Sequence, residues 1–319
     1  MKKIKWGIIS TGNIARSICA DFVHVSNGEI HAVASRSLDT AASFAKHFGI
    51  ERYYDSYEAL YRDPEIDAIY IGTPHNFHRE NATAAMMAGK AVLCEKPITT
   101  NENELRQLIE TAKNTNTYLM EAMWTYFLPA IIQAKSWLDS GEIGELKHIR
   151  ADFAFLADPQ TNLRLFDPKL AGGALLDIGI YPIALSCLAM PQLPISICAS
   201  SKKASTGVDS EESMVFEYLN GTTANLMASF LFDMPNDAYF IGTKGYISIP
   251  EFFMAKECFL YKNKQIAGHF VDDKPTVGYS YELEAVNNDL LAGKKQSEIM
   301  PWSVSIMLQK IMDIVKQKF

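Results

Sequence analysis

The chain has 319 residues, of which 48% are hydrophobic and 21% are charged, and its formal net charge is -7 at pH 7. This length is long for one hydrophobic core and predicts two domains, while the composition is that of a globular protein rather than a disordered one. A negative balance without a basic stripe argues against a nucleic-acid partner. No apolar run approaches the roughly 20 residues that a bilayer span requires, so no membrane segment is expected.

The N-terminal residues and the cysteines bear on the cellular compartment. Lysines followed by an apolar run superficially resemble a leader, but Thr11-Gly12-Asn13 and Arg16 interrupt the run, and a first β-strand explains it better. The five cysteines are scattered and include no Cys-x-x-Cys pair. We expect buried free thiols and a cytoplasmic protein. These cysteines are Cys19, Cys94, Cys187, Cys198 and Cys258.

The first third of the chain alternates strand-like runs with segments of helical period. One predicted helix starts at the candidate N-cap Ser37 and closes at Gly49, and another opens with Asn101 and Glu104, a variant of the capping box. Repeated β-α-β units of this length predict a parallel, doubly wound sheet. The strand-like runs are 4–9, 30–34, 67–71, 91–95 and 118–122.

The rhythm changes after about residue 122, which predicts domains at 1–122 and 123–319. A helix is expected from Pro129 to Gly141, followed by an alternating, half-buried strand at 146–155. The later strands predict a largely antiparallel sheet, solvated or paired on one face. Further strand-like runs are 195–201, 213–219, 223–232, 238–241 and 246–249, and the last helices are expected at 281–292 and 302–318.

A phosphate-binding turn is predicted directly after the first strand. A G-x-G-x-x-G/A fingerprint binds pyrophosphate there through backbone N–H groups at a helix start. Gly12 allows close approach of the phosphate, whereas Ser10 replaces the usual first glycine, so the turn is expected to use a φ open to other residues. A lone match is weak, and the β-α-β context strengthens it. The turn reads Ser10-Thr11-Gly12-Asn13-Ile14-Ala15.

The end of the second strand, Ala34-Ser35-Arg36, bears on cofactor choice. Folds that select NAD place an Asp or Glu near here to bind the ribose hydroxyls, and this chain has none at the strand end. A hydroxyl and a guanidinium suit a 2'-phosphate, because Arg offers it a charge-assisted fork. The sequence therefore predicts NADP over NAD. The alternative is that both residues cap the next helix and face water.

Two segments follow strands at the edge where open parallel sheets bind ligands. Glu95-Lys96-Pro97 presents a cation there, unless the strand simply stops at a solvated charge pair, and its X-Pro bond can be cis. Thr73-Pro74-His75 is expected to start a helix lining the nicotinamide crevice. His75 and His78 lack supporting ligands at suitable spacing, so we predict no metal site.

A glycine-rich segment at 172–182 begins a predicted helix in the second domain. Asp177 and Tyr181 are four residues apart and would share one face of an α-helix. A tyrosine on a helix is commonly a boundary core residue. It becomes a proton donor or acceptor only if a cation such as Lys96 lies beside it, which the sequence cannot show.

Taken together, these motifs resemble the glucose-fructose oxidoreductase, inositol dehydrogenase and MocA (Gfo/Idh/MocA) family. The similarity is greatest to its dimeric dihydrodiol dehydrogenase and NADP-dependent D-xylose dehydrogenase branch. It implies a Rossmann domain followed by an α/β domain with an open-faced sheet, and a homodimer or higher homo-oligomer. The motifs are the turn at 7–15, Gly72-Thr73-Pro74-His75, Cys94-Glu95-Lys96-Pro97, Glu121-Ala122-Met123-Trp124-Thr125, the segment 172–181, Thr206-Gly207-Val208-Asp209 and Gly242-Thr243-Lys244-Gly245.

The resemblance also implies roles for single residues. Many family members have His at the position of Tyr181. With a tyrosine there, the chain resembles the sugar and dihydrodiol branch of the family. Lys147 and Phe153 fall where that branch has an active-site Arg and Phe. The implied catalytic residues are Lys96, Tyr181 and Asp177; the substrate contacts are His78, Trp124, Lys147, Phe153 and Arg164; and the cofactor contacts are Ser10, Thr11, Gly12, Asn13, Ile14, Ser35, Arg36, Thr73, Pro74, His75, Glu95 and Lys96.

The sequence therefore predicts an NADP-dependent oxidoreductase, with NAD use left possible, that moves hydride between nicotinamide and a carbinol carbon of a sugar, cyclic polyol or dihydrodiol. Tyr181 would exchange the hydroxyl proton, and Lys96 would favour the loss of that proton and orient the substrate oxygen. The alternative is a regulatory protein that binds NADP(H) without turnover, since a fold and a cofactor site do not establish catalysis. Retention of Lys96 and Tyr181 favours the enzyme. The sequence names neither the substrate nor the reaction direction.

Overall fold

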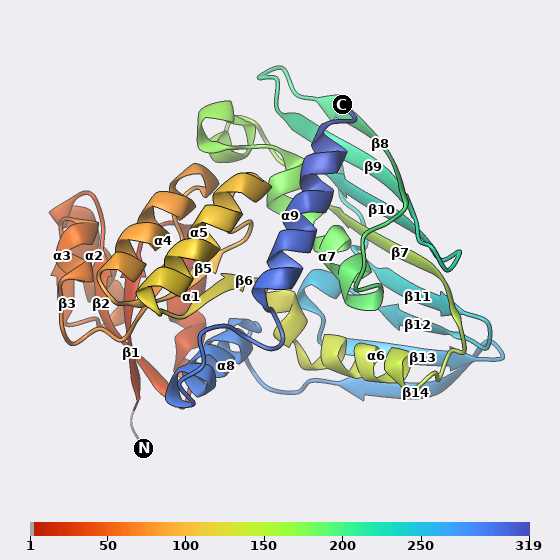
Figure 1. Ribbon diagram of the computed structural model, residues 1–319, viewed down its shortest axis with the longest axis horizontal. Coiled ribbons are helices and arrows are strands. Elements are labelled where there is room, and N and C mark those ends of the chain that lie inside the picture. The colour runs from red at the N-terminus through yellow and green to blue at the C-terminus, as the bar shows by residue number, and fades with distance from the viewer. Residues whose placement is uncertain (1–2) are drawn as a thin grey trace. The chain divides into compact units, whose positions relative to one another are not determined.

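The computed structural model describes residues 3–319 and divides into two compact units (Figure 1). The first unit comprises the residues up to Trp124 together with Pro275–Ser305, and the second comprises Thr125–Lys274 and Ile306–Phe319. The domain boundary at 122 and 123 stays a prediction. The compact units differ from it mainly in giving a late stretch of chain to the first unit.

The first unit is built on a six-stranded sheet of order β3-β2-β1-β4-β5-β6, in which every pair is parallel. Its central strands are apolar and buried on both faces, as parallel strands covered by helices must be. This order confirms the predicted doubly wound sheet. The three-residue β3 was not predicted, because it is short and largely exposed. The strands are β1 (Ile4–Ile9), β2 (Gly28–Ala34), β3 (Arg52–Tyr54), β4 (Ala68–Ile71), β5 (Ala91–Glu95) and β6 (Leu119–Ala122).

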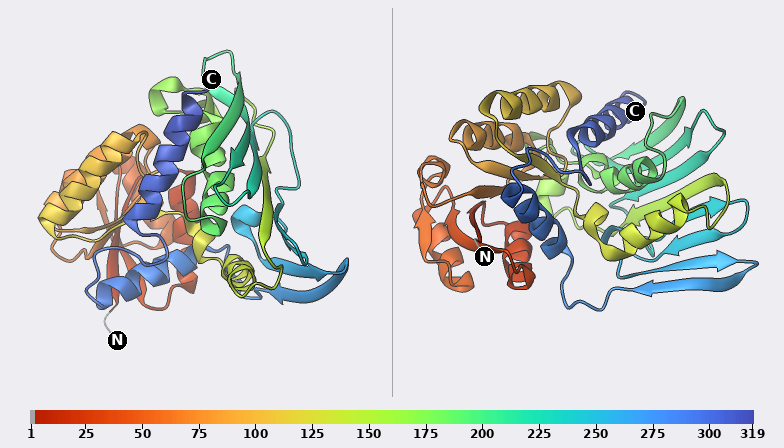
Figure 2. Two further views of the ribbon diagram at one scale, coloured as in Figure 1. Left: turned by 45° about the vertical axis from the view of Figure 1, so that its right-hand side comes forward. Right: turned by 60° about the horizontal axis from the view of Figure 1, so that its bottom comes forward.

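Helices cover both faces of this sheet (Figure 2). One predicted end and one predicted start are confirmed. Gly49 ends α2 with a φ of 69°. Asn101 begins α5, where its side chain accepts a hydrogen bond from the Glu104 N–H at 3.0 Å. The helices are α1 (Asn13–Asp21), α2 (Leu38–Phe48), α3 (Tyr57–Tyr61), α4 (His78–Met87), α5 (Glu102–Thr115) and α8 (Tyr279–Leu291).

The second unit contains an eight-stranded sheet of order β14-β13-β12-β11-β7-β10-β9-β8. All pairs are antiparallel except β7 with β10, which confirms a largely antiparallel sheet. The edge strand β14 and its neighbour β13 were not predicted, and the exposed polar residues of β14 weaken its pattern. The strands are β7 (Leu146–Ala154), β8 (Ser196–Lys203), β9 (Asp209–Glu217), β10 (Thr223–Ser229), β11 (Ala238–Gly242), β12 (Tyr246–Ile249), β13 (Glu257–Lys262) and β14 (Gln265–Val271).

Helices α6 (Pro129–Asp139) and α7 (Ile180–Ala189) pack on one face of this sheet, and α9 (Trp302–Lys316) runs into the unit from the first (Figure 2). The 22-residue stretch Pro168–Ala189 is apolar and long enough to cross a membrane, so the expectation that no run approaches that length was wrong. Lys169 and Asp177 interrupted the run in the sequence. Its apolar window is 78% buried inside the protein, as in a core helix.

All five cysteines are free thiols. Cys19, Cys94, Cys187 and Cys258 are buried as predicted, and burial raises the pKa of the Cys19 and Cys258 thiols to about 12. Cys198 is exposed, so the prediction was wrong there. It lies on β8, where side chains alternate between the two faces and the outward one meets solvent.

Buried polar contacts hold the late segment within the first unit. The Trp6 indole N–H donates to the Asn287 side chain of α8 at 2.9 Å. At the end of α1, the Asp21 carboxylate accepts from the Thr276 hydroxyl at 2.6 Å and from the Val277 and Ser280 N–H groups at 2.8 Å each. Burial alone would raise the pKa of Asp21, but these hydrogen bonds outweigh it and lower the pKa.

Replacing Asp21 tests this anchor. Asp21→Asn should lower the free energy of unfolding at pH 7 by about 2 kcal/mol, because an amide cannot accept all three bonds. A carboxyl with a lowered pKa stabilises the fold above its unfolded pKa and loses that effect as pH falls through the folded value. The difference from wild type should therefore shrink below about pH 4. Urea titrations measure both effects, and the exposed Asp55→Asn is the control. A loss as large in the control would contradict the anchor.

Candidate active site

The turn between β1 and α1 provides a binding place for an anion. Gly12, the residue before α1, is extended, and no side chain caps the helix by a hydrogen bond. The first turn of α1 also carries no acidic residue. Its leading N–H groups therefore face the loop with the positive end of the helix dipole, which fits a dinucleotide phosphate.

Ser10 corrects one expectation about this turn. The sequence predicted a φ open to any residue, but Ser10 adopts a φ of 93°, in the left-handed region that favours glycine. Its hydroxyl oxygen accepts a hydrogen bond from the Gly12 N–H at 3.1 Å, and this local bond compensates part of the strain. Ser10 thus adopts the backbone conformation that a glycine usually provides at this position of the fingerprint.

Ser35 and Arg36 follow β2 at the same edge of the sheet. Ser35 is largely buried and Arg36 is exposed. Burial raises the pKa of Tyr57 at the start of α3, and the charge of Arg36 acts in the opposite direction, so the guanidinium lies within electrostatic reach of this phenol. Two donors and no strand-end carboxylate fit a 2'-phosphate. That contact stays a prediction.

Lys96 stands directly after β5, beside a buried carboxylate. The Tyr70 hydroxyl donates to Glu95 Oε1 at 2.5 Å, and the Lys96 backbone N–H lies 3.3 Å from Oε2. The Lys96–Pro97 peptide bond is cis. The carboxyl ends of β1, β2, β4 and β5 meet at one edge of the sheet, so the phosphate turn and this cation belong to the same ligand-binding edge.

His78 links two loops at this edge. Its ring is fully buried, with Nδ1 2.8 Å from the Pro97 carbonyl oxygen and Nε2 2.7 Å from the Thr73 carbonyl oxygen. The His75 ring lies 5.6 Å away. The predicted contact between His78 and the substrate stays a prediction. The contacts that the structure shows are with the two backbone carbonyl oxygens. Within residues 3–319, no three His, Cys, Asp or Glu side chains gather as a metal ion would need.

Trp124 stacks on Tyr279, a residue that the sequence did not suggest. Their ring centroids are 4.4 Å apart with an interplanar angle of 25°, and both residues belong to the first unit. Tyr279 opens α8, far along the chain from Trp124. No motif marks it, because the pairing depends on the return of the late segment.

In the second unit, Asp177 lies in a π-helix, Leu175–Gly179, which precedes α7. Hydrogen bonds in a π-helix run from i to i+5, so the α-helical argument that put Asp177 and Tyr181 on one face does not apply there. Asp209 Oδ2 accepts from the Leu175 N–H at 2.6 Å and fixes the start of this segment. Short π-helical turns occur frequently at functional sites.

The structure brings some predicted residues of this unit together and separates one. Arg164 pairs with Asp177 at 2.7 Å. Lys147 instead pairs with Glu145, with its side chain 48% exposed. It lies six residues before Phe153 on β7, which is roughly 20 Å along a strand. Lys147 is thus remote from the Phe153 end of β7, and its substrate role stays a prediction.

Aromatic rings surround Tyr181. The Phe153 ring centroid is 5.3 Å from that of Tyr181 in an edge-to-face arrangement, and Phe253 stacks on Phe153 at 4.0 Å. Phe253 comes from the short helix Phe252–Met254 and was not predicted. These rings form an apolar wall beside the phenol.

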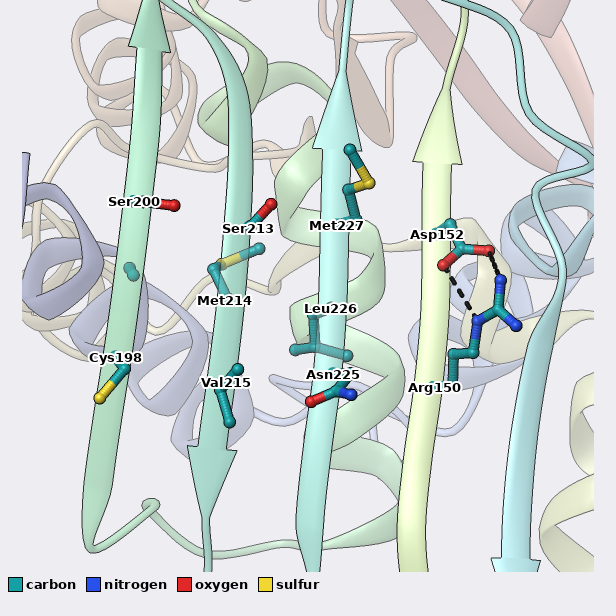
Figure 3. Close-up of a pocket in the computed structure, with 11 residues that line it drawn as sticks. Arg150, Asp152, Cys198, Ser200, Ser213, Met214, Val215, Asn225, Leu226 and Met227 are labelled. Carbon is teal, nitrogen blue, oxygen red and sulfur yellow. Dashed lines mark hydrogen bonds and ion pairs between the residues drawn. The ribbon is translucent and has the colours of Figure 1, made fainter.

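The face of the eight-stranded sheet opposite to α6 and α7 carries a shallow groove (Figure 3). Arg150 and Asp152 form an ion pair at 3.1 Å along one side of it, on β7. Side chains of β8, β9 and β10 line the rest, including Cys198, Val215 and Met227. The groove is mixed in polarity and lies on the open face, away from the buried Tyr181 side of the sheet.

Comparison with known proteins gives matches along nearly the whole chain. Residues 4–123 match the family described as "Oxidoreductase family, NAD-binding Rossmann fold", and residues 131–248 match the "GFO/IDH/MocA C-terminal domain". The trans-1,2-dihydrobenzene-1,2-diol dehydrogenase of Xenopus laevis is 36% identical over 318 residues, covering 97% of this chain and 96% of the relative. The protein of the same name from Homo sapiens is 33% identical and covers 98% and 96%.

Solved structures agree with the fold. An aldose-aldose oxidoreductase from Caulobacter crescentus, solved with glycerol, has a TM-score of 0.91 at 22% identity over 99% of this chain and 97% of that one, which supports the fold alone. A 3-ketoreductase from Actinomadura kijaniata, solved with NADP and TDP-benzene, has a TM-score of 0.87 at 27% identity over 99% and 98%. A levoglucosan dehydrogenase solved with NADH and levoglucosan has a TM-score of 0.88 at 20% identity, over 99% and 97%.

Proposed function

The chain belongs to the Gfo/Idh/MocA oxidoreductase family, and on that premise we propose that it is an NADP-dependent dehydrogenase of a sugar, a cyclic polyol or a dihydrodiol. Its relatives along nearly the whole chain are dehydrogenases, so it is an NAD(P)-dependent oxidoreductase acting on CH–OH groups. The observation that carries the finer proposal is Lys96, a cation at the ligand-binding edge of the parallel sheet.

The cofactor preference rests on the residues of this chain. NADP is bound in the ketoreductase neighbour and NADH in the levoglucosan dehydrogenase, so the neighbours include both cofactors. Ser35 and Arg36 follow β2 without a carboxylate, which supports NADP. When bound, the nicotinamide supplies the hydride acceptor or donor, and the turn from Ser10 to Asn13 would hold its diphosphate.

Tyr181 and Lys96 are proposed to handle the proton. The phenol would exchange the proton of the substrate hydroxyl, and the ammonium would favour the deprotonated phenol and orient the substrate oxygen. Arg164 is paired with Asp177, which supports a role for this pair in holding the polar side of the substrate. The wall of Phe153 and Phe253 beside Tyr181 would suit a ring-shaped, partly apolar substrate.

A substrate screen tests the function. Purified protein is mixed with NADP or NAD and with aldoses, cyclic polyols and dihydrodiols, and the absorbance of the reduced nicotinamide is followed. Turnover with one class identifies the substrate group. Tight NADP binding without turnover of any class would support the alternative, a regulatory protein that binds NADP(H). We also retain a cytoplasmic location as a proposal, supported by the free, mostly buried thiols.

Arg36→Ala tests the cofactor preference. It should weaken NADP binding by roughly 1 to 3 kcal/mol, the scale of a charge-assisted hydrogen bond, and leave NAD binding nearly unchanged. Calorimetric titration of both cofactors measures the difference, and the exposed Arg62→Ala in the same unit is the control. Equal weakening of NADP and NAD would assign Arg36 to the fold instead of the phosphate.

Tyr181→Phe tests the proton transfer. It keeps the ring and removes the hydroxyl, so turnover should fall by about 10² to 10⁴ with cofactor affinity little changed. Lys96→Met keeps most of the stem and deletes the cation, and should also lower turnover. If the two groups act on one substrate as a unit, the double variant should be scarcely slower than the worse single variant.

The control for these variants is Tyr53→Phe, which removes a hydroxyl from an exposed strand. It should turn over substrate at the wild-type rate. Near-wild-type turnover by Tyr181→Phe, under conditions where hydride transfer limits the rate, would return Tyr181 to a packing role.

We further propose a homodimer through the open face of the eight-stranded sheet. Aromatic side chains line that face, with Tyr246 and Tyr261 stacked at 4.6 Å and Phe259 and His269 at 4.3 Å. Val215 is 44% exposed there. Within residues 3–319 no helix covers this face (Figure 2). A second copy would bury these aromatic and apolar side chains.

Val215→Glu tests the dimer. In a two-fold interface each substitution is buried against the same patch of the partner, so the charge should disrupt assembly. Light scattering should give about twice 35.6 kDa for wild type and 35.6 kDa for the variant. Val23→Glu, at a side chain 79% exposed in the first unit, should remain dimeric. Wild-type protein that scatters as a monomer at micromolar concentration would refute the dimer.

A further inference from the structure

Three buried carboxyl groups lie around the ligand-binding edge of the first unit. Glu95 ends β5, Glu121 lies on β6 and Glu282 lies on α8, and their exposed fractions are 8%, 3% and 0%. Charged carboxylates are rarely buried without partners, so each of the three requires an explanation. They differ in the donors that reach them.

Glu95 is arranged as an acceptor on both oxygens. The Tyr70 hydroxyl donates to Oε1 at 2.5 Å, and the Lys96 N–H lies 3.3 Å from Oε2. Two converging donors stabilise the ionised form of a carboxyl group. Glu95 therefore carries a negative charge directly beside Lys96 in the chain.

Glu282 has the opposite environment. Among residues 3–319, neither of its carboxyl oxygens has a hydrogen-bond partner, although the side chain is fully buried. Burial raises the pKa of Glu282 well above its ordinary value, and the charge of Glu95 raises it further. An ionised Glu282 would thus be desolvated, unpaired and repelled, whereas a neutral acid avoids all three penalties.

Three phenols near Glu282 do not supply a compensating charge. Burial raises the pKa of Tyr70, Tyr118 and Tyr279, and the charge of Glu282 raises each of these pKa values further, so all three phenols are neutral at physiological pH. The Tyr118 hydroxyl donates to Asp289 Oδ2 at 3.0 Å.

Glu121 is the third carboxyl of the cluster. Burial raises its pKa to about 7, with Glu95 raising it and Lys96 lowering it, and its Oε1 accepts from the Ile98 N–H at 2.9 Å. Lys96 is therefore within electrostatic reach of this cluster.

We propose that the Glu95–Glu282 pair holds one proton in the folded enzyme and that Glu282 carries this proton. Glu282 is thereby a positioning residue that keeps the negative charge on Glu95 beside Lys96. The inference rests on the proposed function, because a charge at Glu282 matters to the reaction only if Lys96 acts in it. A second carboxylate would offset the positive potential of the Lys96 ammonium, on which the proposed proton transfer depends.

Glu282→Gln in the apo protein tests the proton. An acid whose folded pKa is raised stabilises the fold below its unfolded pKa and loses that effect as pH rises toward the folded value. Between about pH 5 and pH 8, the unfolding equilibrium constant of wild type relative to the variant should therefore rise by up to tenfold per pH unit. Urea titrations without cofactor measure the ratio. A ratio that is constant over this range would overturn the proposal.

A second variant allows the same test if Glu282→Gln fails to fold. Glu282→Met is also neutral and of similar length, and it should show the same pH-dependent ratio. The titrations of Glu121 and Asp21 are common to wild type and variants, so they cancel in the ratio while the variants keep the native fold. Glu95→Gln, introduced into wild type and into Glu282→Gln, is the matched test of the pair. Without the charge of Glu95, the pH range over which the ratio rises should end at lower pH.

The pH profile of kcat/KM tests the positioning role. Ionisation of Glu282 at alkaline pH should depress wild-type kcat/KM, and Glu282→Gln cannot ionise, so its alkaline limb should lie at least half a pH unit higher. A role in packing alone would not shift this limb. Identical limbs would overturn the positioning role even where the stability ratio is as expected. The stability ratio needs no cofactor or substrate, so its failure is separate from a failure of the proposed function.

Discussion

Every strand of the first unit's sheet is parallel, and this constraint determines where its chemistry lies. Parallel strands deliver all of their carboxyl ends to one edge, so the segments that follow them meet there whatever their distance in the chain. The turn at Ser10, the pair Ser35 and Arg36, the Thr73 loop and Lys96 follow β1, β2, β4 and β5 in this way. The helices that return the chain cover both faces, which leaves this edge as the place where polar groups and a ligand can meet.

Burial of polar groups is the second theme of the structure. Around Lys96 the fold tolerates carboxyls that have few partners, and each departs from the ordinary behaviour of a surface glutamate in its own way. Glu95 accepts from two donors, Glu121 accepts from the Ile98 N–H and the Ser305 side chain, and Glu282 accepts from none within the described residues. Such arrangements reduce stability and are commonly retained where a site needs a defined charge.

The local signals in the sequence predicted much of this architecture. The strand-helix alternation, the end of α2 at Gly49 and the start of α5 at Asn101 are encoded within a few residues, so they could be read directly. The left-handed backbone of Ser10 could not, because its side chain offers a local hydrogen bond that a residue-type rule does not anticipate. The π-helix before α7 also breaks a rule that assumes α-helical spacing.

The candidate site was less predictable for a physical reason. Lys96, Asp177 and Tyr181 lie in recognisable motifs, whereas Tyr279 and Glu282 acquire their surroundings only when α8 packs in the first unit. Phe253 likewise meets Phe153 through tertiary packing. Periodicity reports which face of an element is buried, and it does not report which distant element covers it.

The discontinuous first unit has a consequence for the order of events during synthesis. Its sheet is complete once β6 has been made, but Tyr279, Glu282 and the partners of Asp21 are translated only after the whole eight-stranded sheet. Until then Trp124 lacks its stacking partner, and the Asp21 carboxylate lacks its four donors in residues 276–280. The nascent chain must therefore hold an unfinished first unit while the eight-stranded sheet of the second unit is made, and the ligand-binding edge gains Tyr279 and Glu282 only after that sheet.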